Sequence, residues 1–230
     1  MPKIVDHDQR RRDLVLATRR IIVRQGLSGA TMRDIAAEAG FANGVIKTYF
    51  GAKSDLLAAT YLDVFEATNR RVEESTAGLR GMAALRAFVG EVLPVTEETH
   101  EEARVVLSYL AEVAQNPDHA RTTAVTMELW EGWIVAWLSE AREDGSLRAE
   151  VDVAREADVL LTYLLGAQTM AIVGGGRFDF DGFRAQLDYG LGRLETRAPA
   201  PEHETTRHAV KNDRIVGNSS DGRDWPPGWG

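Results

Sequence analysis

The stretch that decides the fold of the N-terminal part is residues 31–50, TMRDIAAEAGFANGVIKTYF. Thr31 followed three residues later by Asp34 is the spacing of a capped helix start. Gly40 accepts the left-handed conformation that ends a helix, so a short helix is predicted from Met32 to Ala39. The stretch therefore begins with a short, well-delimited helix.

A second short helix is predicted from about Asn43 to Tyr49, after the turn 40–42. Two such helices form a helix-turn-helix if apolar side chains face each other across the turn. Six residues meet this requirement: Ile35, Ala36, Ala39, Val45, Ile46 and Phe50. A preceding helix that ends at Gly26 offers a third apolar wall: Leu14, Ala17, Thr18 and Ile21. The second helix of such a unit enters the major groove of DNA.

The rest of the chain is also predicted to be helical. Capping residues, glycines and prolines divide it into segments of about 53–75, 81–92, 98–115, 119–143, 152–173 and 180–195. Alternating Val, Ile and Thr runs are absent, so the sequence gives no case for a sheet. We predict an all-α protein of about nine helices: an N-terminal three-helix helix-turn-helix domain and a C-terminal helical domain.

The charge of the chain is unevenly distributed. The net charge is −8, but residues 1–55 hold ten Lys and Arg against six Asp and Glu, which leaves +4. The remainder holds 17 basic and 29 acidic residues, or −12. A basic N-terminal segment on an acidic body indicates that the N-terminal end contacts phosphates; chance scatter of charge is the alternative.

Catalytic and metal-binding motifs are absent from the sequence. It has no cysteine, and its five histidines lack metal-ligand neighbours at a working spacing. No nucleophile elbow or phosphate loop occurs. We therefore expect no enzyme, no metal and no cofactor. The most apolar stretch, from Val159 to Val173, is shorter than a membrane span and is expected to be a buried helix in a cytoplasmic protein without membrane contact.

The segment 26–57 closely resembles the DNA-binding domain of the TetR family of regulators. The matching positions are Gly26, Thr31, Ile35, Ala36, Ala39, Gly40, Gly44, Tyr49, Phe50, Lys53, Leu56 and Leu57. Residues 98–150 are similar to the BetI-type C-terminal domain. The resemblance implies nine helices, a homodimer and repression relieved by a small molecule. Ala42, Val45 and Lys47 depart from common Ser or Thr, Thr and Tyr, which alters the contacts expected with DNA.

The expected partner of the N-terminal domain is a double-stranded DNA operator. Lysine can donate to guanine and asparagine can pair with adenine, so residues on the exposed face of the second helix are candidate base contacts: Asn43, Lys47 and Thr48. Phosphate contacts are expected from Arg33, Tyr49 and Lys53. For Arg33 and the three candidate base contacts, the alternative is an ordinary solvated surface residue.

The C-terminal domain is expected to bind a small-molecule effector. One face of the helix 119–143 is aromatic, and the candidate lining residues are Tyr109, Met127, Trp130, Trp133 and Trp137. Such a pocket suits a large apolar molecule or a quaternary ammonium held by cation–π contact. The alternative is that this aromatic stripe belongs to the core.

The last two helices are expected to form a homodimer through a four-helix interface. The candidate residues are Leu160, Tyr163, Leu164, Ala167, Met170, Leu187 and Leu191, with intramolecular core as the alternative. The expected domains are 1–52 for DNA binding and 53–196 for ligand binding and dimerisation, followed by a disordered tail, 197–230. Two other functions stay open: a helical scaffold that does not bind DNA, and a DNA-binding protein without an effector.

Overall fold

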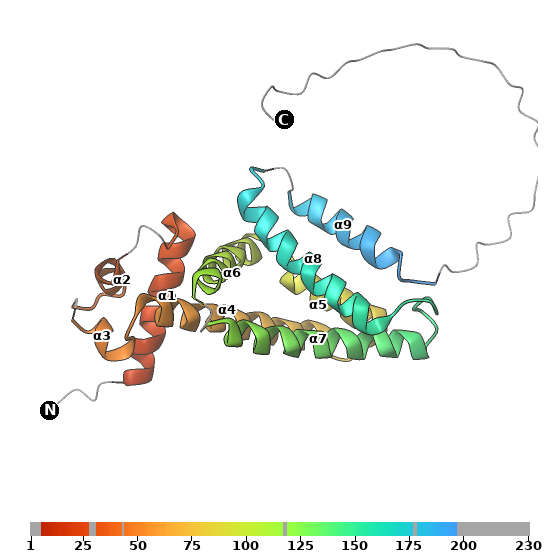
Figure 1. The fold of residues 1–230 in the computed structure, drawn as a ribbon, viewed down its shortest axis with the longest axis horizontal. Helices are drawn as coiled ribbons and strands as arrows, with labels where there is room; N and C mark the ends of the chain where they lie inside the picture. The colour runs from red at the N-terminus through yellow and green to blue at the C-terminus, as the bar shows by residue number, and fades with distance from the viewer. Residues whose placement is uncertain (1–5, 28–30, 43, 117–118, 177–178, 197–230) are drawn as a thin grey trace, which may run out of the picture. The chain divides into compact units, whose positions relative to one another are not determined.

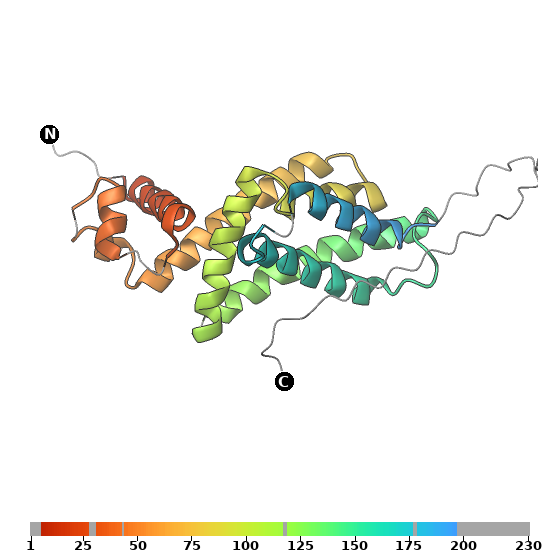
Figure 2. The same cartoon turned by 90° about the horizontal axis from the view of Figure 1, so that it is seen from above.

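A computed structural model describes residues 6–27, 31–42, 44–116, 119–176 and 179–196. Asn43 and the tail 197–230 lie outside the described residues. The described part contains nine helices (Figures 1 and 2): α1 (His7–Gln25), α2 (Met32–Glu38), α3 (Ile46–Tyr49), α4 (Lys53–Thr76), α5 (Gly81–Val92), α6 (Glu97–Gln115), α7 (Ala120–Glu143), α8 (Val153–Val173) and α9 (Phe180–Gly192). The all-α prediction is confirmed.

Helices α1, α2 and α3 form the predicted helix-turn-helix unit around a small core of their own. The helix stops at Gly26 and Gly40 are confirmed, with φ of 75° and 74°. Thr31 and Asp34 make the predicted capping box, in which each side chain bonds the backbone of the other. The core contains the predicted residues Leu14, Ala17, Ile21, Ile35, Ala36, Ile46 and Phe50, together with Val15 and Leu56. Helix α3 is shorter than expected because Gly44 and Val45 form a turn before it.

Helix α4 takes part in two cores. Its first turns pack on α1 and its later turns pack on α5 and α6. A cluster of buried residues surrounds the place where α1, α4 and α6 meet: Ile22, Leu57, Tyr61, Val64, Val105, Val106 and Tyr109. The rings of Tyr61 and Tyr109 stack with centroids 4.3 Å apart. The helix-turn-helix is therefore joined to the remaining helices by continuous apolar packing.

The main core lies between α4, α5, α7, α8 and α9. Helix α5 begins at Gly81, where φ is 53° and an added Cβ would lie 3.3 Å from the backbone of Ala141 on α7. The predicted chain break at this glycine thus also permits close packing of two helices. Asp152 caps α8 as predicted, since its side chain accepts a hydrogen bond from the backbone N–H of Arg155.

A backbone clip joins the α7–α8 loop to the chain that follows α9. Leu147 and Glu195 form an isolated antiparallel bridge, and the N–H of Arg148 donates to the carbonyl of Leu194 at 2.9 Å. Within the described residues, this bridge is the one strand-like backbone pairing. It fixes the end of α9 against the end of α7.

Helix α8 is long and apolar enough, by length and composition alone, to cross a membrane. Its 21 residues exceed the apolar stretch recognised in the sequence. It packs along one side on α6 and α7, as expected for a core helix. Its other side carries exposed apolar side chains, including Val159, Met170 and Val173.

Candidate DNA interface and internal cavity

The helix-turn-helix presents the predicted polar residues on its outer surface. Lys47 and Thr48 of α3 are exposed, whereas Ile46 between Val45 and Lys47 is completely buried. Arg33 of α2 is also exposed. These side chains are free to meet DNA, and their assignment as base or phosphate contacts stays a prediction, as does that of Asn43, which lies outside the described residues.

Tyr49 is half-buried at the end of α3, and two side chains of α1 hold this end in place. The ring of His7 lies 5.6 Å from that of Tyr49. Arg11 donates to the carbonyl of Tyr49 at 3.3 Å, and its guanidinium lies 4.4 Å from the ring centroid of Phe50. A cation at the last carbonyls of a helix is stabilising. Sequence reasoning missed Arg11, and its only signal was the basic run 10–12.

Lys53 has a structural contact besides its predicted phosphate contact. Its Nζ donates to the carbonyl of Leu27 at 2.6 Å, which ties the start of α4 to the chain after α1. An ammonium group has three donors, so this bond leaves two for a phosphate.

A carboxylate clamps the two helices that support α3. Glu38 of α2 accepts hydrogen bonds from Arg20 at 2.9 Å and Arg24 at 3.0 Å, both on α1. These hydrogen bonds lower the pKa of Glu38 below its ordinary value of 4.5. Because the pKa is lowered in the folded protein, the stabilisation is present above pH 4.5 and is lost as the pH falls through the lowered value.

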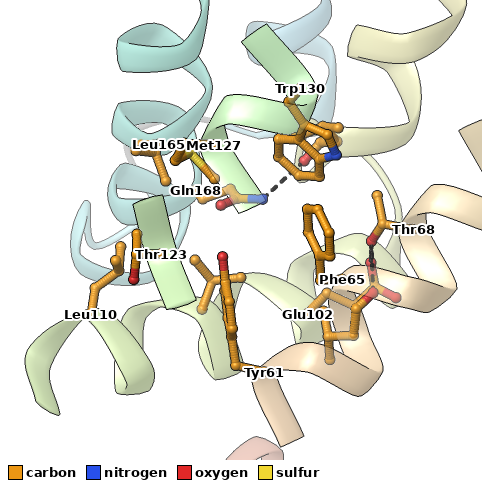
Figure 3. A pocket seen from close by; sticks show the side chains of 13 residues that line it. Tyr61, Phe65, Thr68, Glu102, Leu110, Thr123, Met127, Trp130, Leu165 and Gln168 are labelled. Atoms are coloured by element: carbon orange, nitrogen blue, oxygen red, sulfur yellow. Dashed lines mark hydrogen bonds between the residues drawn. The ribbon is translucent and has the colours of Figure 1, made fainter. Parts of the chain in front are cut away.

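An internal cavity lies between α4, α6, α7 and α8 (Figure 3). Its lining is mostly apolar and includes Tyr61, Val64, Phe65, Thr68, Val92, Glu102, Val106, Leu110, Thr123, Met127, Trp130, Leu165 and Gln168. The cavity has a volume of about 20 Å³, room for about one water molecule. A larger occupant must therefore push lining side chains apart.

Glu102 is the charged residue of this lining, and it is 4% exposed. Arg71 of α4 donates two hydrogen bonds to its carboxylate, at 2.7 and 3.0 Å. Thr68 donates a third at 3.3 Å (Figure 3), and Arg19 of α1 lies 3.6 Å away. Burial acts to lower the pKa of Arg71, but the hydrogen bond and charge of Glu102 outweigh it and the net shift is upward.

The other polar groups of the lining are hydroxyls and an amide. Tyr61 shares a 2.7 Å hydrogen bond with Thr126, and burial raises the pKa of Tyr61 in spite of that bond. The amide of Gln168 donates to the carbonyl of Val92 at 3.2 Å. The Thr123 hydroxyl is buried without a partner in the described part of the chain, and it lies across the cavity from Glu102 (Figure 3).

Only two of the five predicted pocket residues, Met127 and Trp130, line this cavity. Tyr109 stacks behind Tyr61, and its hydroxyl donates to the carbonyl of His119 at 3.0 Å. Trp133 and Trp137 pack instead on Phe88 of α5. The aromatic stripe of α7 thus faces two neighbours, because α7 crosses both α5 and α8. Sequence reasoning missed Tyr61, Phe65 and Glu102, which lie on α4 and α6.

The predicted dimer residues divide into two groups. Four of them belong to the core of a single protomer: Leu160, Leu164, Ala167 and Leu191. Tyr163 and Leu187 line a groove of about 140 Å³ between α8 and α9, which Leu160 and Leu191 also line, and Met170 is exposed. These four residues pack inside one protomer, and the assignment of all seven residues to a dimer interface stays a prediction.

Two family models match the chain. Residues 14–60 match "Bacterial regulatory proteins, tetR family", and residues 81–195 match "BetI-type transcriptional repressor, C-terminal". The chain belongs to the TetR family. It is thus a DNA-binding transcriptional regulator with a C-terminal domain of the BetI repressor type. The first match covers the helix-turn-helix and the second covers α5 to α9, while the part of α4 that lines the cavity lies between the two.

Individual relatives agree with this assignment. The TetR-family chain is 31% identical over 172 residues to the regulator BetI of Paraburkholderia phymatum, which covers 73% of the chain and 86% of that protein. It is 33% identical over 119 residues to the regulator PksA of Bacillus subtilis, but spans only 58% of that protein. Both relatives are described as helix-turn-helix transcriptional regulators.

Solved TetR-like structures show the same fold. A transcriptional regulator from Saccharomonospora viridis, in complex with choline, has a TM-score of 0.76 at 21% identity and covers 83% of the chain and 100% of that structure. A regulator from Rhodococcus sp. Rha1 has a TM-score of 0.72 at 23% identity, with 82% and 99% covered. Both likenesses concern the fold alone.

Lys47 and Tyr49 of α3 give different expectations for mutation. We expect Lys47→Ala to weaken binding to the preferred DNA by about 1–3 kcal/mol and to relax sequence preference, as for a lost base contact. Tyr49→Phe, which keeps the ring against His7, should weaken all DNA sequences alike. Fluorescence anisotropy with preferred and scrambled duplexes measures both effects. Unchanged affinity and preference in Lys47→Ala would refute the base contact.

The Glu38 clamp gives an expectation for pH. Between about pH 5 and 3, the thermal midpoint of the wild-type protein should fall more steeply than that of Glu38→Gln, because the variant has no carboxylate to protonate. Circular dichroism melts measure this difference. Glu128→Gln, an exposed site on α7, is the control and should follow the wild type. Parallel curves for all three proteins would contradict the clamp.

Proposed function

We propose that this regulator binds a palindromic operator in the cytoplasm as a homodimer and is released when an organic cation enters the cavity. The proposed domains are 1–52 for DNA binding and 53–196 for effector binding and dimerisation. The observation that carries the effector class is a nearly buried carboxylate, Glu102, in a cavity walled by Tyr61, Phe65 and Trp130.

The charge balance beside the cavity favours a cation. Arg71 is paired with Glu91 at 3.2 Å, Glu98 at 3.5 Å and Glu102 at 2.7 Å, and Arg19 is the second cation of this group. Three carboxylates thus face two guanidinium groups. The side chains of Glu91 and Glu98 are 28% and 61% exposed, so solvent screens their charge, and the carboxylate that a cation in the cavity would meet is that of Glu102, whose side chain is 5% exposed.

The aromatic walls support the same class of effector. A desolvated cation over an aromatic face gains about 0.5–2 kcal/mol per ring. Phe65 and Trp130 lie with ring centroids 5.2 Å apart, so one ligand can contact both. The S. viridis regulator is described in complex with choline, and quaternary ammonium is therefore the first class to test. A neutral apolar molecule bonded to Thr123 is the alternative.

Exposed apolar residues on α8 and α9 support dimerisation through this face. Val159, Met170 and Val173 are exposed on α8, and Tyr189 of α9 is 71% exposed. The hydroxyl of Tyr163, in the groove between these helices, is buried without a partner in the described protomer. A second copy would cover the apolar face.

The DNA and effector functions are tested together. A selection from random DNA should return an inverted repeat with half-sites about one helical turn apart, bound less tightly as salt rises. Choline should bind by calorimetry and weaken operator affinity. Its neutral isostere 3,3-dimethyl-1-butanol should bind less well. Trp130→Phe should weaken choline binding, and Trp137→Phe, which lies outside the cavity lining, should not.

Three results would contradict these proposals separately. A selected motif without symmetry would exclude the dimeric operator. Equal binding of choline and the isostere would favour the neutral effector. Choline that binds without changing operator affinity would exclude release by this ligand, because a ligand shifts an equilibrium only through differential affinity for its two states.

The dimer face is tested with two exposed valines of similar exposure. Val159→Asp on α8, at a site 53% exposed, should give monomers with greatly weakened operator binding. Val125→Asp on α7, at a site 58% exposed, should remain dimeric. Sedimentation velocity measures the oligomeric state. A dimeric Val159→Asp variant would refute this face as the interface.

A further inference from the structure

Glu102 contacts both the cavity and the helix-turn-helix unit. Glu102 is one of the residues that line the cavity, and its carboxylate is paired with Arg19 on α1. We propose that the Arg19–Glu102 ion pair holds the helix-turn-helix in its DNA-binding position and that an effector in the cavity breaks it, with Arg19 acting as a positioning residue. The effector part of this inference rests on the proposed function of the cavity.

The two arginine partners of Glu102 are held with unequal strength. Arg71 makes two hydrogen bonds to the carboxylate, at 2.7 and 3.0 Å, and also contacts Glu91 and Glu98. Arg19 makes one longer contact of 3.6 Å, and its side chain is 20% exposed. A bidentate pair is the stronger arrangement. A competing cation would therefore displace Arg19 and leave Arg71 in place.

The position of Arg19 in the fold gives this displacement an effect on DNA binding. On the same helix, Leu14 and Ile21 belong to the core of the helix-turn-helix. Helices α1 and α6 also meet through an apolar cluster that contains Ile22 of α1 and Val105 and Val106 of α6. Apolar packing is non-directional, whereas an ion pair fixes one relative position. Loss of the Arg19 contact thus allows α1 to shift along α6.

The ion pair belongs to the arrangement without effector. The cavity beside Glu102 has a volume of about 20 Å³, too little for choline. In a repressor released by its effector, the effector-free arrangement is the one that binds the operator. Removal of the pair should therefore mimic the effector and weaken DNA binding in the absence of any ligand.

The test uses the full chain and the duplex that wild-type protein selects from random DNA. Arg19→Gln and Glu102→Gln should each weaken binding about 5–10-fold, within the usual range of coupling between sites. The double variant should bind DNA no more weakly than whichever single variant binds it less tightly, because both substitutions remove the same contact. Arg19→Lys, which keeps the charge, should restore most of the affinity.

Two controls distinguish the positioning role of Arg19 from a direct phosphate contact and from the effect of removing any ion pair between helices. A lost phosphate contact reduces the salt dependence of binding by about one charge, whereas the salt dependence of Arg19→Gln should equal that of wild type. Arg86→Gln removes a comparable pairing of α5 with Asp188 on α9 and with Glu195 in the chain that follows α9. It should leave operator affinity unchanged. Circular dichroism melts monitor folding of each variant.

Choline supplies the second measurement. Arg19→Gln should bind choline more tightly than wild type, because no Arg19 contact has to be displaced, yet choline should weaken its operator binding much less than it weakens that of wild type. Wild-type operator affinity in Arg19→Gln, or additive losses in the double variant, would overturn the proposed coupling. If choline fails to bind the wild-type protein, the proposed effector class is wrong, and the operator affinities still decide the role of Arg19.

Discussion

The stacking of Tyr61 on Tyr109 is the contact on which the two halves of the protein depend. Tyr61 lies on α4 and Tyr109 on α6, and with Ile22 of α1 they form one buried cluster. Because α4 is a single unbroken helix, its start in the helix-turn-helix core and its later turns beside the cavity are parts of one rigid element. A change in side-chain packing around the cavity thus has a direct mechanical route to the DNA-binding unit.

Charged groups join neighbouring helices at a few positions and fix the orientation of one helix on the next. Glu38 holds α2 on α1, and Glu102 holds α6 against α1 and α4. Apolar contacts supply most of the stability of such a protein, and the hydrophobic effect behind them is non-directional. Charged pairs with defined geometry fix one arrangement. This division is suited to a protein that must alternate between two arrangements without unfolding.

The sequence was sufficient for the helices and for the helix-turn-helix, because local rules control both. Capping at Thr31 and Asp152, glycine stops at Gly26 and Gly40, and helical apolar spacing are short-range signals. The cavity and the exposed face were harder to predict. Leu164 and Met170 both look apolar at helical spacing, but the first is buried in the protomer and the second is exposed. Periodicity identifies a face without identifying its neighbour.

The same limit applies to the cavity residues. Trp130 and Trp137 lie seven residues apart on α7, yet only Trp130 lines the cavity. Tyr61 and Glu102 were not predicted because their roles depend on the crossing of α4 and α6, which no local pattern encodes. Arg11 and Arg19 looked like ordinary basic residues of a DNA-binding domain. Their partners, the Tyr49 carbonyl and Glu102, are distant in sequence.

If an effector binds in the cavity as proposed, the small volume of the cavity also determines the ligand concentration at which the protein responds. A ligand that must open a packed interior binds only the open fraction of molecules, so its apparent dissociation constant equals the intrinsic constant divided by that fraction. The concentration at which the genes respond is then determined by how tightly residues such as Met127 and Leu165 pack. Substitutions among these side chains would change the response threshold while leaving the chemistry of ligand recognition intact. The effector concentration that gives half-maximal response is thus determined by core packing, and single apolar substitutions in the cavity lining can change it.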